Sequence, residues 1–188
     1  MNHQGTLKLT TTRLILRSLQ LTDAESMFLG WTTDPEVVKY LSWKPHISVD
    51  ETKRIISYWM SNYPDPKFYI WGIQLKQGPL IGTISIHSIH DGFERGEVGY
   101  ALMKRYWNQG YVSEALSAIV DYAFGVVGFN RLEAHHSVYN PASGAVLIKA
   151  GFQHEGVLRQ YYRANDGFQD SSIYGMLKKD WQLAHPGL

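Results

Sequence analysis

The segment between Met103 and Tyr111 has residue types and a spacing that could bind a phosphate group. A β-rich run over residues 97–103 ends there, a polar Asn-Gln-Gly turn follows at 108–110, and a helical apolar pattern then begins. The first turn of a helix has unpaired N–H groups and the positive end of the helix dipole, and a glycine lets the backbone approach an anion closely. This order of elements predicts a diphosphate site. A helix start that only needs a flexible residue is the alternative, because one glycine matches neither the dinucleotide motif nor the NTPase phosphate loop.

A second group of polar residues follows further along the chain. Asn140 and Ser143 stand at a junction between a β-rich run and a helical pattern, and Lys149 and Gly151 close that pattern. Asn140, followed by proline at the first helical position, also fits a helix N-cap, and Gly151 fits a C-cap. Alone, these residues are as compatible with helix capping as with a binding site.

The histidines offer no recognisable metal site. His135 and His136 are adjacent on a predicted strand, so their side chains point to opposite faces. No carboxylate or histidine at ligand spacing completes a site with them or with His87 and His90. We therefore expect no bound metal, and we expect these histidines to be exposed or hydrogen-bonded.

The composition excludes several other kinds of chemistry. The chain has 188 residues and no cysteine, which rules out a cysteine nucleophile, thiolate metal sites and disulfides. Lys and Arg number 18 against 17 Asp and Glu, and a net charge of +1 argues against binding nucleic acid or membranes through bulk charge. The N-terminus lacks the layout of a signal peptide, and the apolar stretches are too short to span a bilayer, so a cytoplasmic protein is expected.

The elements that must position these residues alternate between hairpins and helices. Helix start signals stand at Thr22 with Glu25 and at Ser48 with Glu51. Interleaved helices and hairpins favour an α+β domain in which helices flank a mixed sheet. The length fits one domain over residues 1–188, with residues 1–10 as a candidate flexible arm. The predicted strands are 13–19, 68–75, 80–89, 97–103, 131–138, 152–162 and 169–177, and the predicted helices begin at 23 and 48 or cover 111–127 and 141–150.

A set of short motifs runs through nearly the whole chain. Its segments are Thr12–Arg17, Gly96–Tyr100, Trp107–Tyr111 with Ser113–Ala115, Asn130–Glu133, Asn140–Ser143, Lys149–Phe152 and Gly167–Asp170. In this order and spacing they resemble the GNAT superfamily of N-acetyltransferases, and more narrowly its ribosomal-protein N-acetyltransferase (RimJ/RimL-like) branch. The resemblance implies the GNAT fold, with a mixed sheet of about seven strands, about four helices, and a strand pair that splays apart where the cofactor binds.

The resemblance also implies acetyl-CoA as the cosubstrate. Two positions depart from the family's cofactor motif: Asn108 stands where glycine is commonest, and Val112 replaces a small residue. Because both keep their backbone N–H groups, diphosphate binding by residues 108–113 is still implied, although Val112 could instead pack into the core. The implied cofactor-binding residues are Ala101, Leu102, Met103, Asn108, Gln109, Gly110, Tyr111, Val112, Ser113, Asn140, Ser143 and Lys149.

The mechanism that the resemblance implies is direct attack of a substrate amine on the thioester. Glu97 is the first candidate for the base that takes the amine's proton, and Glu133 on the next strand is the second. Leu147 occupies the place where many family members carry a tyrosine acid, so Ser143 is the candidate hydrogen-bond donor to the leaving thiolate. For the aromatic residues near the expected cleft, core packing is the alternative role. The candidate substrate-binding residues are Trp31, Tyr40, Trp43, Tyr100 and Tyr161.

The favoured acceptor is the α-amine of a protein N-terminus, such as that of a ribosomal protein. An α-amine with a pKa near 8 is about 10% neutral at pH 7, whereas a lysine is roughly 0.04% neutral, so an α-amine demands little of the base. The alternatives are a small-molecule acceptor such as a polyamine, an amino acid or a drug amine, and a non-catalytic acyl-CoA sensor. We expect a monomer or a homodimer.

Overall fold

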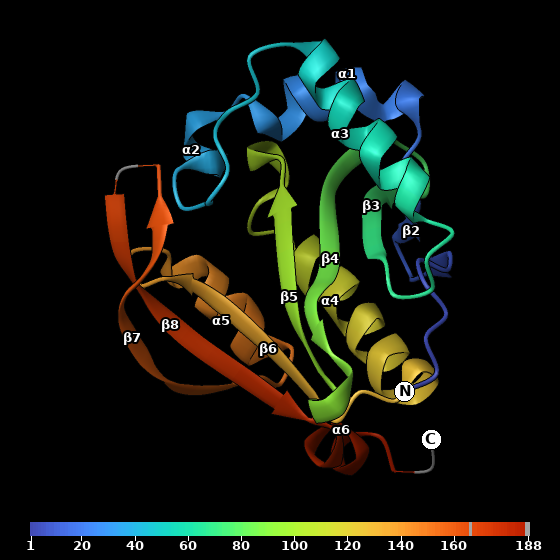
Figure 1. Ribbon diagram of the computed structural model, residues 1–188, viewed down its shortest axis with the longest axis vertical. Coiled ribbons are helices and arrows are strands. Elements are labelled where there is room, and N and C mark those ends of the chain that lie inside the picture. The colour runs from blue at the N-terminus through green and yellow to red at the C-terminus, as the bar shows by residue number, and fades with distance from the viewer. Residues whose placement is uncertain (166, 187–188) are drawn as a thin grey trace.

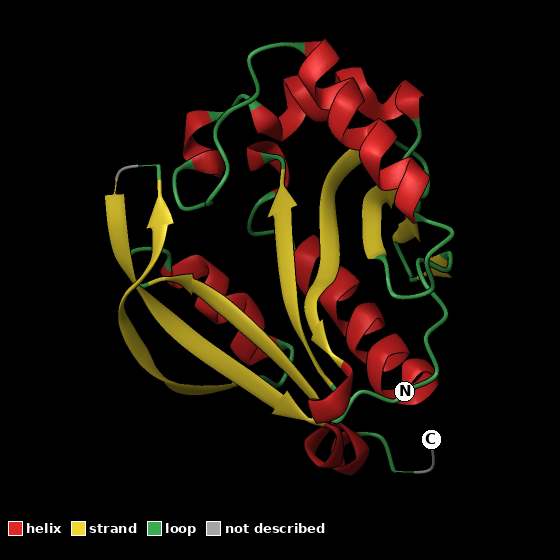
Figure 2. Ribbon diagram, viewed as in Figure 1, coloured by secondary structure: helices red, strands yellow, loops and turns green. Residues whose placement is uncertain are grey.

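The computed structural model describes residues 1–165 and 167–186, which build one mixed eight-stranded sheet with helices on both faces (Figures 1 and 2). The strand order is β1-β2-β3-β4-β5-β6-β8-β7, and β5 with β6 is the parallel pair among antiparallel ones. The strands are β1 Leu9–Thr10, β2 Leu14–Arg17, β3 Tyr69–Leu75, β4 Leu80–His90, β5 Arg95–Leu102, β6 Arg131–Ser137, β7 Gln153–Ala164 and β8 Gly167–Leu177. The α-helices are α1 Ala24–Met27, α2 Pro35–Val38, α3 Val49–Asn62, α4 Tyr111–Asp121, α5 Pro141–Lys149 and α6 Lys178–Ala184.

This is the expected α+β arrangement of helices around a mixed sheet, with three elements that the sequence pattern did not predict, β1, α2 and α6. Strand β1 is only two residues long, too short to show alternation. Helix α6 follows β8 directly, and its Trp181 is buried and donates a hydrogen bond to Asp121 at 2.8 Å. That contact joins residues 60 positions apart. A local pattern carries no information about it.

The two helix start signals have different outcomes. Ser48 is the N-cap of α3, and its side chain accepts a hydrogen bond from the Glu51 N–H, as predicted. The signal at Thr22 is wrong, because the chain turns two residues earlier, with Gln20 as the N-cap. The Asp23 carboxylate accepts a hydrogen bond from the Gln20 N–H and forms an ion pair with Arg17, so a 3₁₀ turn begins at Leu21 and leads into α1.

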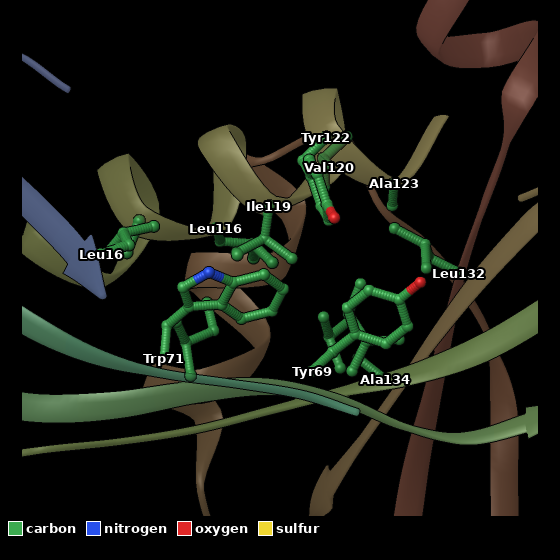
Figure 3. Close-up of a cluster of buried hydrophobic side chains, with 14 of the residues drawn as sticks. Leu16, Tyr69, Trp71, Leu116, Ile119, Val120, Tyr122, Ala123, Leu132 and Ala134 are labelled. Carbon is green, nitrogen blue, oxygen red and sulfur yellow. The ribbon is translucent and has the colours of Figure 1, made fainter. Parts of the chain in front are cut away.

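The main core lies between α4 and the sheet (Figure 3). Leu116 and Ile119 on α4 pack toward Tyr69 and Trp71 of β3, and all four side chains are buried. A π-helical turn over Tyr122–Val127 extends α4 to Gly128, whose left-handed conformation ends the helix as expected near residue 127. A second buried cluster, built around Trp31 and Ile56, lies under α1 and α3 on the opposite face of the sheet.

Residues 1–10, the candidate flexible arm, pack along the molecule. The Asn2 N–H donates to the Val127 carbonyl at 2.7 Å, and the Trp71 indole donates to the Leu7 carbonyl at 2.6 Å. The hydroxyl of Tyr122 donates to the Gly5 carbonyl at 2.7 Å. These bonds tie the arm to β3 and to the end of the α4 region.

The parallel strands β5 and β6 diverge along their length (Figure 2). They pair only from Arg95–Val98 against Arg131–Ala134, although β5 continues to Leu102 and β6 to Ser137. The expected splayed strand pair is therefore present. Beyond Val98 and Ala134, backbone groups of two neighbouring strands face each other without pairing.

No helix in residues 1–165 and 167–186 is long and apolar enough to cross a membrane. The same residues contain no cluster of three or more side chains suited to hold a metal ion.

Candidate functional site

A cavity of about 1270 Å³ opens at the diverging strands. Residues of β5, β6, α5 and the start of α4 line one part of it, and residues 27–59 with Tyr161 and Tyr162 of β7 line another. Most of the expected site residues line this cavity. The exceptions are Met103 and Gln109.

The turn before α4 presents unpaired N–H groups to the cavity. Asn108 and Gly110 both take left-handed conformations, with φ of +58° and +77°. Asparagine tolerates that region better than most residues, so Asn108 fits where glycine is commonest in the family. The first helical bond of α4 runs from the Glu114 N–H to the Gly110 carbonyl, which leaves the N–H groups of residues 111–113 without helical partners. Asn108, Gly110 and residues 111–113 line the cavity, an arrangement suited to an anion.

A half-buried carboxylate holds this turn against the chain at the start of β2. Glu114 accepts hydrogen bonds from the Thr11 hydroxyl at 2.5 Å and from the backbone N–H and Nε of Arg13 at 2.7 and 2.6 Å. Burial alone would raise the pKa of Glu114, but these bonds outweigh it and hold the pKa below its ordinary value. Arg13 also donates to the Gln109 carbonyl at 3.0 Å and stacks over Tyr111. Gln109 therefore shapes the turn, and its own side chain bonds Arg105 outside the cavity.

The alternation of β5 decides which backbone groups face the splay. The Met103 N–H donates to the Ile81 carbonyl of β4 at 2.8 Å, so this N–H and the backbone groups of Ala101 point toward β4, while the Met103 carbonyl accepts from the Tyr106 N–H. The backbone groups of Tyr100 and Leu102 then point toward β6, and the Leu102 carbonyl already accepts the Trp107 indole N–H at 2.8 Å. Of the expected backbone positions 101–103, the Leu102 N–H faces the splay, where Tyr100 also presents its backbone groups, while Ala101 lines the cavity.

Ser143 on α5 is paired with Tyr100. The Tyr100 hydroxyl lies 2.8 Å from Ser143 Oγ and 3.2 Å from the Ser143 carbonyl. Burial raises the pKa of Tyr100 to about 12, so the phenol keeps its proton and can donate it to either the hydroxyl or the carbonyl oxygen of Ser143. Tyr100 was expected to contact the acceptor. Strand alternation instead turns it to the α5 side with Val98 and Leu102, away from Glu97.

The other two α5 residues of the predicted site also face the cavity. Asn140 is the N-cap of α5 by position, but its side chain makes no capping hydrogen bond, so the plain capping role does not explain it. Lys149 is exposed in the last turn of α5. Both remain available to a ligand at this end of the cavity.

The two candidate bases, Glu97 and Glu133, have different charged neighbours. Glu97 lines the cavity, and His87 Nδ1 lies 3.9 Å from its carboxylate. Glu133 does not line the cavity and forms ion pairs with Arg95 at 3.0 Å and Arg131 at 2.8 Å. Burial opposes ionisation of Glu133, yet the two arginines outweigh it and keep its pKa below the ordinary value. A carboxylate held in this way is a poor proton acceptor, so the geometry favours Glu97.

The acceptor side of the cavity has an aromatic wall. Tyr40, Trp43, Tyr161 and the neighbouring Tyr162 line it, together with Trp59, which the sequence pattern did not single out. Trp31 also borders the cavity, but with 1% exposure it belongs mainly to the core under α1.

The β7–β8 hairpin bonds to the segment after α2 over this wall. Asn165 Nδ2 donates to the Val38 and Trp43 carbonyls, each at 3.0 Å, and the Tyr162 hydroxyl donates to the Tyr40 carbonyl at 3.3 Å. The hairpin and this segment lie close together in Figure 1. These bonds bridge two walls of the cavity that are more than 120 residues apart in sequence.

His136 is hydrogen-bonded, as expected, whereas His135 is half-buried and makes no hydrogen bond to the described residues. Both line the cavity, from opposite faces of β6, and each has one buried ring nitrogen without a partner among the described residues. His136 Nδ1 donates to the Ser137 carbonyl at 2.7 Å, and its Nε2 is the unpaired nitrogen. Burial lowers the pKa of His136. No spacing rule could have found them, because the splay of β5 from β6 exposes them to the cavity.

The turn before α4 and the unpaired edge of β5 fit two parts of acetyl-CoA. The left-handed turn with free N–H groups suits the diphosphate, and the unpaired edge of β5 suits the amides of an extended chain. Val112 lines the cavity and also packs against the core, so its size does not close the site.

Comparison with known proteins agrees with this fit. Residues 13–153 match the family model described as an acetyltransferase (GNAT) domain. The uncharacterized N-acetyltransferase YoaA of Bacillus subtilis (strain 168) is 36% identical over 171 residues, covering 90% of this chain and 96% of YoaA. The [ribosomal protein uS5]-alanine N-acetyltransferase of Escherichia coli (strain K12) is 24% identical, covering 93% and 92%. A GNAT-family acetyltransferase from Bacillus anthracis superposes with a TM-score of 0.81 at 24% identity, covering 92% and 99%. The chain belongs to the GNAT family and is an acetyl-CoA-dependent N-acetyltransferase.

Proposed function

We propose that the protein acetylates the α-amine of a polypeptide N-terminus. The observation that carries this proposal is the charge of the acceptor side. Two carboxylates line the cavity, and one of them, Glu36, is bound to Lys104 at 2.5 Å. Glu97 has no lysine or arginine partner in the part of the chain that the structure describes. Asp34, the other acid of this segment, caps α2. One available carboxylate matches one ammonium group, whereas a polyamine carries several.

Glu97 and Ser143 act on opposite sides of the reaction in this proposal. Acetyl-CoA, when bound, supplies the thioester whose carbonyl carbon the amine attacks. Glu97 holds the incoming ammonium group and takes its proton, directly or through a water molecule. Ser143 donates a hydrogen bond to the leaving sulfur, and the Tyr100 hydroxyl at 2.8 Å orients Ser143. The two residues come from β5 and α5, which the splay holds apart.

Two further observations bear on the acceptor. The aromatic wall suits an acceptor with apolar or aromatic groups near its amine. The name of the related uS5-alanine enzyme supports a ribosomal-protein N-terminus as the target. The bridge of Tyr162 and Asn165 to residues 38–43 favours the second candidate, a small-molecule amine, because it narrows access from that side.

A thiol-release assay with acetyl-CoA distinguishes these acceptors. The panel contains peptides with free N-termini, the same peptides N-blocked but carrying lysine, polyamines, and free amino acids. The chain has no cysteine, so it adds no thiol background. Release with free N-termini is the expected result. Release with polyamines or amino acids alone would establish the small-molecule function, and acetyl-CoA binding without any release would point to the sensor.

A further inference from the structure

His135 occupies the point where the two strands part. Ala134 is the last residue of β6 that pairs with β5, so His135 is the first residue of β6 inside the splay. Glu97 and Glu133 are register partners, which places the His135 and Glu97 side chains on one face of the sheet. Both side chains also line the cavity, at the point where the two strands begin to diverge. A ligand in this part of the cavity can therefore reach both side chains.

The surroundings of the His135 ring differ between its two nitrogens. The ring stacks on Tyr161 with centroids 5.1 Å apart and planes 12° from parallel. Nδ1 is buried without a hydrogen-bond partner among the described residues. Nε2 also has no hydrogen-bond partner among those residues, but it is accessible to solvent. It therefore faces the cavity that His135 lines.

This asymmetry fixes where the ring carries its hydrogen. A buried N–H group without an acceptor is rare in proteins, because it loses its hydrogen bond to water and gains none in return. The hydrogen of the neutral ring is therefore favoured on Nε2, where a ligand in the cavity can accept it. His135 thus offers one hydrogen-bond donor beside the carboxylate of Glu97.

We propose that His135 Nε2–H donates a hydrogen bond to the carbonyl oxygen next to the acceptor's amine. Together with Glu97, it would recognise the pair of groups, ammonium and carbonyl, that an α-aminoacyl compound presents. The site then selects peptides and amino-acid amides over amines that lack the carbonyl. This inference rests on the proposed α-amine function and names the chemical feature of the acceptor that the site recognises.

Two acceptors that differ in this carbonyl test the inference, alongside a peptide that begins with phenylalanine. Phenylalaninamide has the carbonyl, and 2-phenylethylamine has the same ring and amine without it. His135→Phe keeps a ring to stack on Tyr161 and removes both nitrogens. We expect kcat/KM to fall about tenfold for the peptide and the amide, and less than twofold for 2-phenylethylamine. Comparing variant with wild type for each acceptor cancels the different pKa values of the amines.

Controls separate recognition from structural damage. His135→Gln restores an N–H donor and should recover part of the activity on the amide. His90→Phe is the matched control, because His90 is exposed, stacks on Phe93 and lies outside the cavity. The melting temperature and the acetyl-CoA affinity of His135→Phe should match the wild type. If that variant does not fold, His135→Leu takes its place.

Each outcome bears on one proposal or the other. Equal losses on the amide and on 2-phenylethylamine, or no loss on either, would overturn the role of His135 while leaving the peptide function intact. Turnover of the amide but not of the peptide, with the expected selective loss, would support His135 and overturn the protein acceptor. A wild-type enzyme that uses 2-phenylethylamine as well as it uses the amide would refute recognition of the carbonyl.

Discussion

Removing the Tyr100 hydroxyl should slow the reaction through Ser143 and not through the binding of acetyl-CoA. Tyr100→Phe keeps the ring that packs between β5 and α5. It deletes only the oxygen that lies 2.8 Å from Ser143 Oγ and 3.2 Å from the Ser143 carbonyl. Ser143 keeps its hydroxyl and its place in the cavity wall, but none of the residues that the structure describes then holds that hydroxyl in one orientation.

The size of the effect follows from these two bonds. A hydrogen bond to a charged group contributes about 1.5–3 kcal/mol, so Ser143→Ala should lower kcat roughly 10- to 100-fold. The neutral bond from Tyr100 contributes about 0.5–1.5 kcal/mol, which corresponds to a loss of roughly 2- to 10-fold in kcat for Tyr100→Phe. Because burial raises the pKa of Tyr100 to about 12, the phenol keeps its proton throughout an ordinary assay range, and the loss should not depend on pH.

A double-mutant cycle is the assay for this link. Steady-state kcat is measured for the wild type, both single variants and the double variant, and calorimetry measures their acetyl-CoA affinities. If Tyr100 acts through Ser143, adding Tyr100→Phe to Ser143→Ala should change kcat by less than about twofold. A full additional loss in the double variant would refute the link. Unchanged kcat in both single variants would remove the pair from the mechanism.

Three other changes test separate parts of the site. Gly110→Asp should weaken acetyl-CoA binding at least about tenfold, because it places a negative charge at the helix start and a side chain at φ +77°; calorimetry with normal affinity would mean that the diphosphate lies elsewhere. Glu97→Gln should lower kcat about 100-fold and change its pH profile at similar acetyl-CoA affinity, whereas an unchanged kcat at every pH would exclude Glu97 as the base. Burial lowers the pKa of His46 below its ordinary 6.5, so the imidazole binds a proton more readily in the unfolded chain than in the folded one. The free energy of unfolding should therefore fall as pH drops below about 6.5, by at most about 1.4 kcal/mol per pH unit. Urea unfolding should show a smaller fall for His46→Asn, and equal slopes in the two proteins would contradict this assignment.

The sequence predicted the elements whose signals are local. Alternation located β3, β4 and β5, helical periodicity located α4, and the Ser48 cap located the start of α3. The turn at Asn108 and Gly110 was predictable because its function depends on backbone conformation at neighbouring positions. Both residues adopt the left-handed conformation that such a turn requires.

The parts that were missed depend on contacts between distant segments. Arg13 and Glu114 are 101 residues apart, and no local pattern connects them, yet together they hold the anion-binding turn. Tyr100 was assigned to the wrong side because aromatic character does not reveal which face of β5 points to α5. His135 was not singled out because its unpaired ring nitrogen matters only where β5 diverges from β6, and the sequence does not show where the two strands diverge.

The central claim is that this acetyltransferase modifies an α-amine, and one product analysis tests it most directly. A peptide with a free N-terminus and one internal lysine is incubated with the enzyme and acetyl-CoA, and fragmentation mass spectrometry locates the added acetyl group. Acetylation at the α-nitrogen, with the lysine unmodified, is the predicted result. Acetylation of the lysine, or a peptide left unmodified while the same enzyme acetylates a polyamine, would contradict the account.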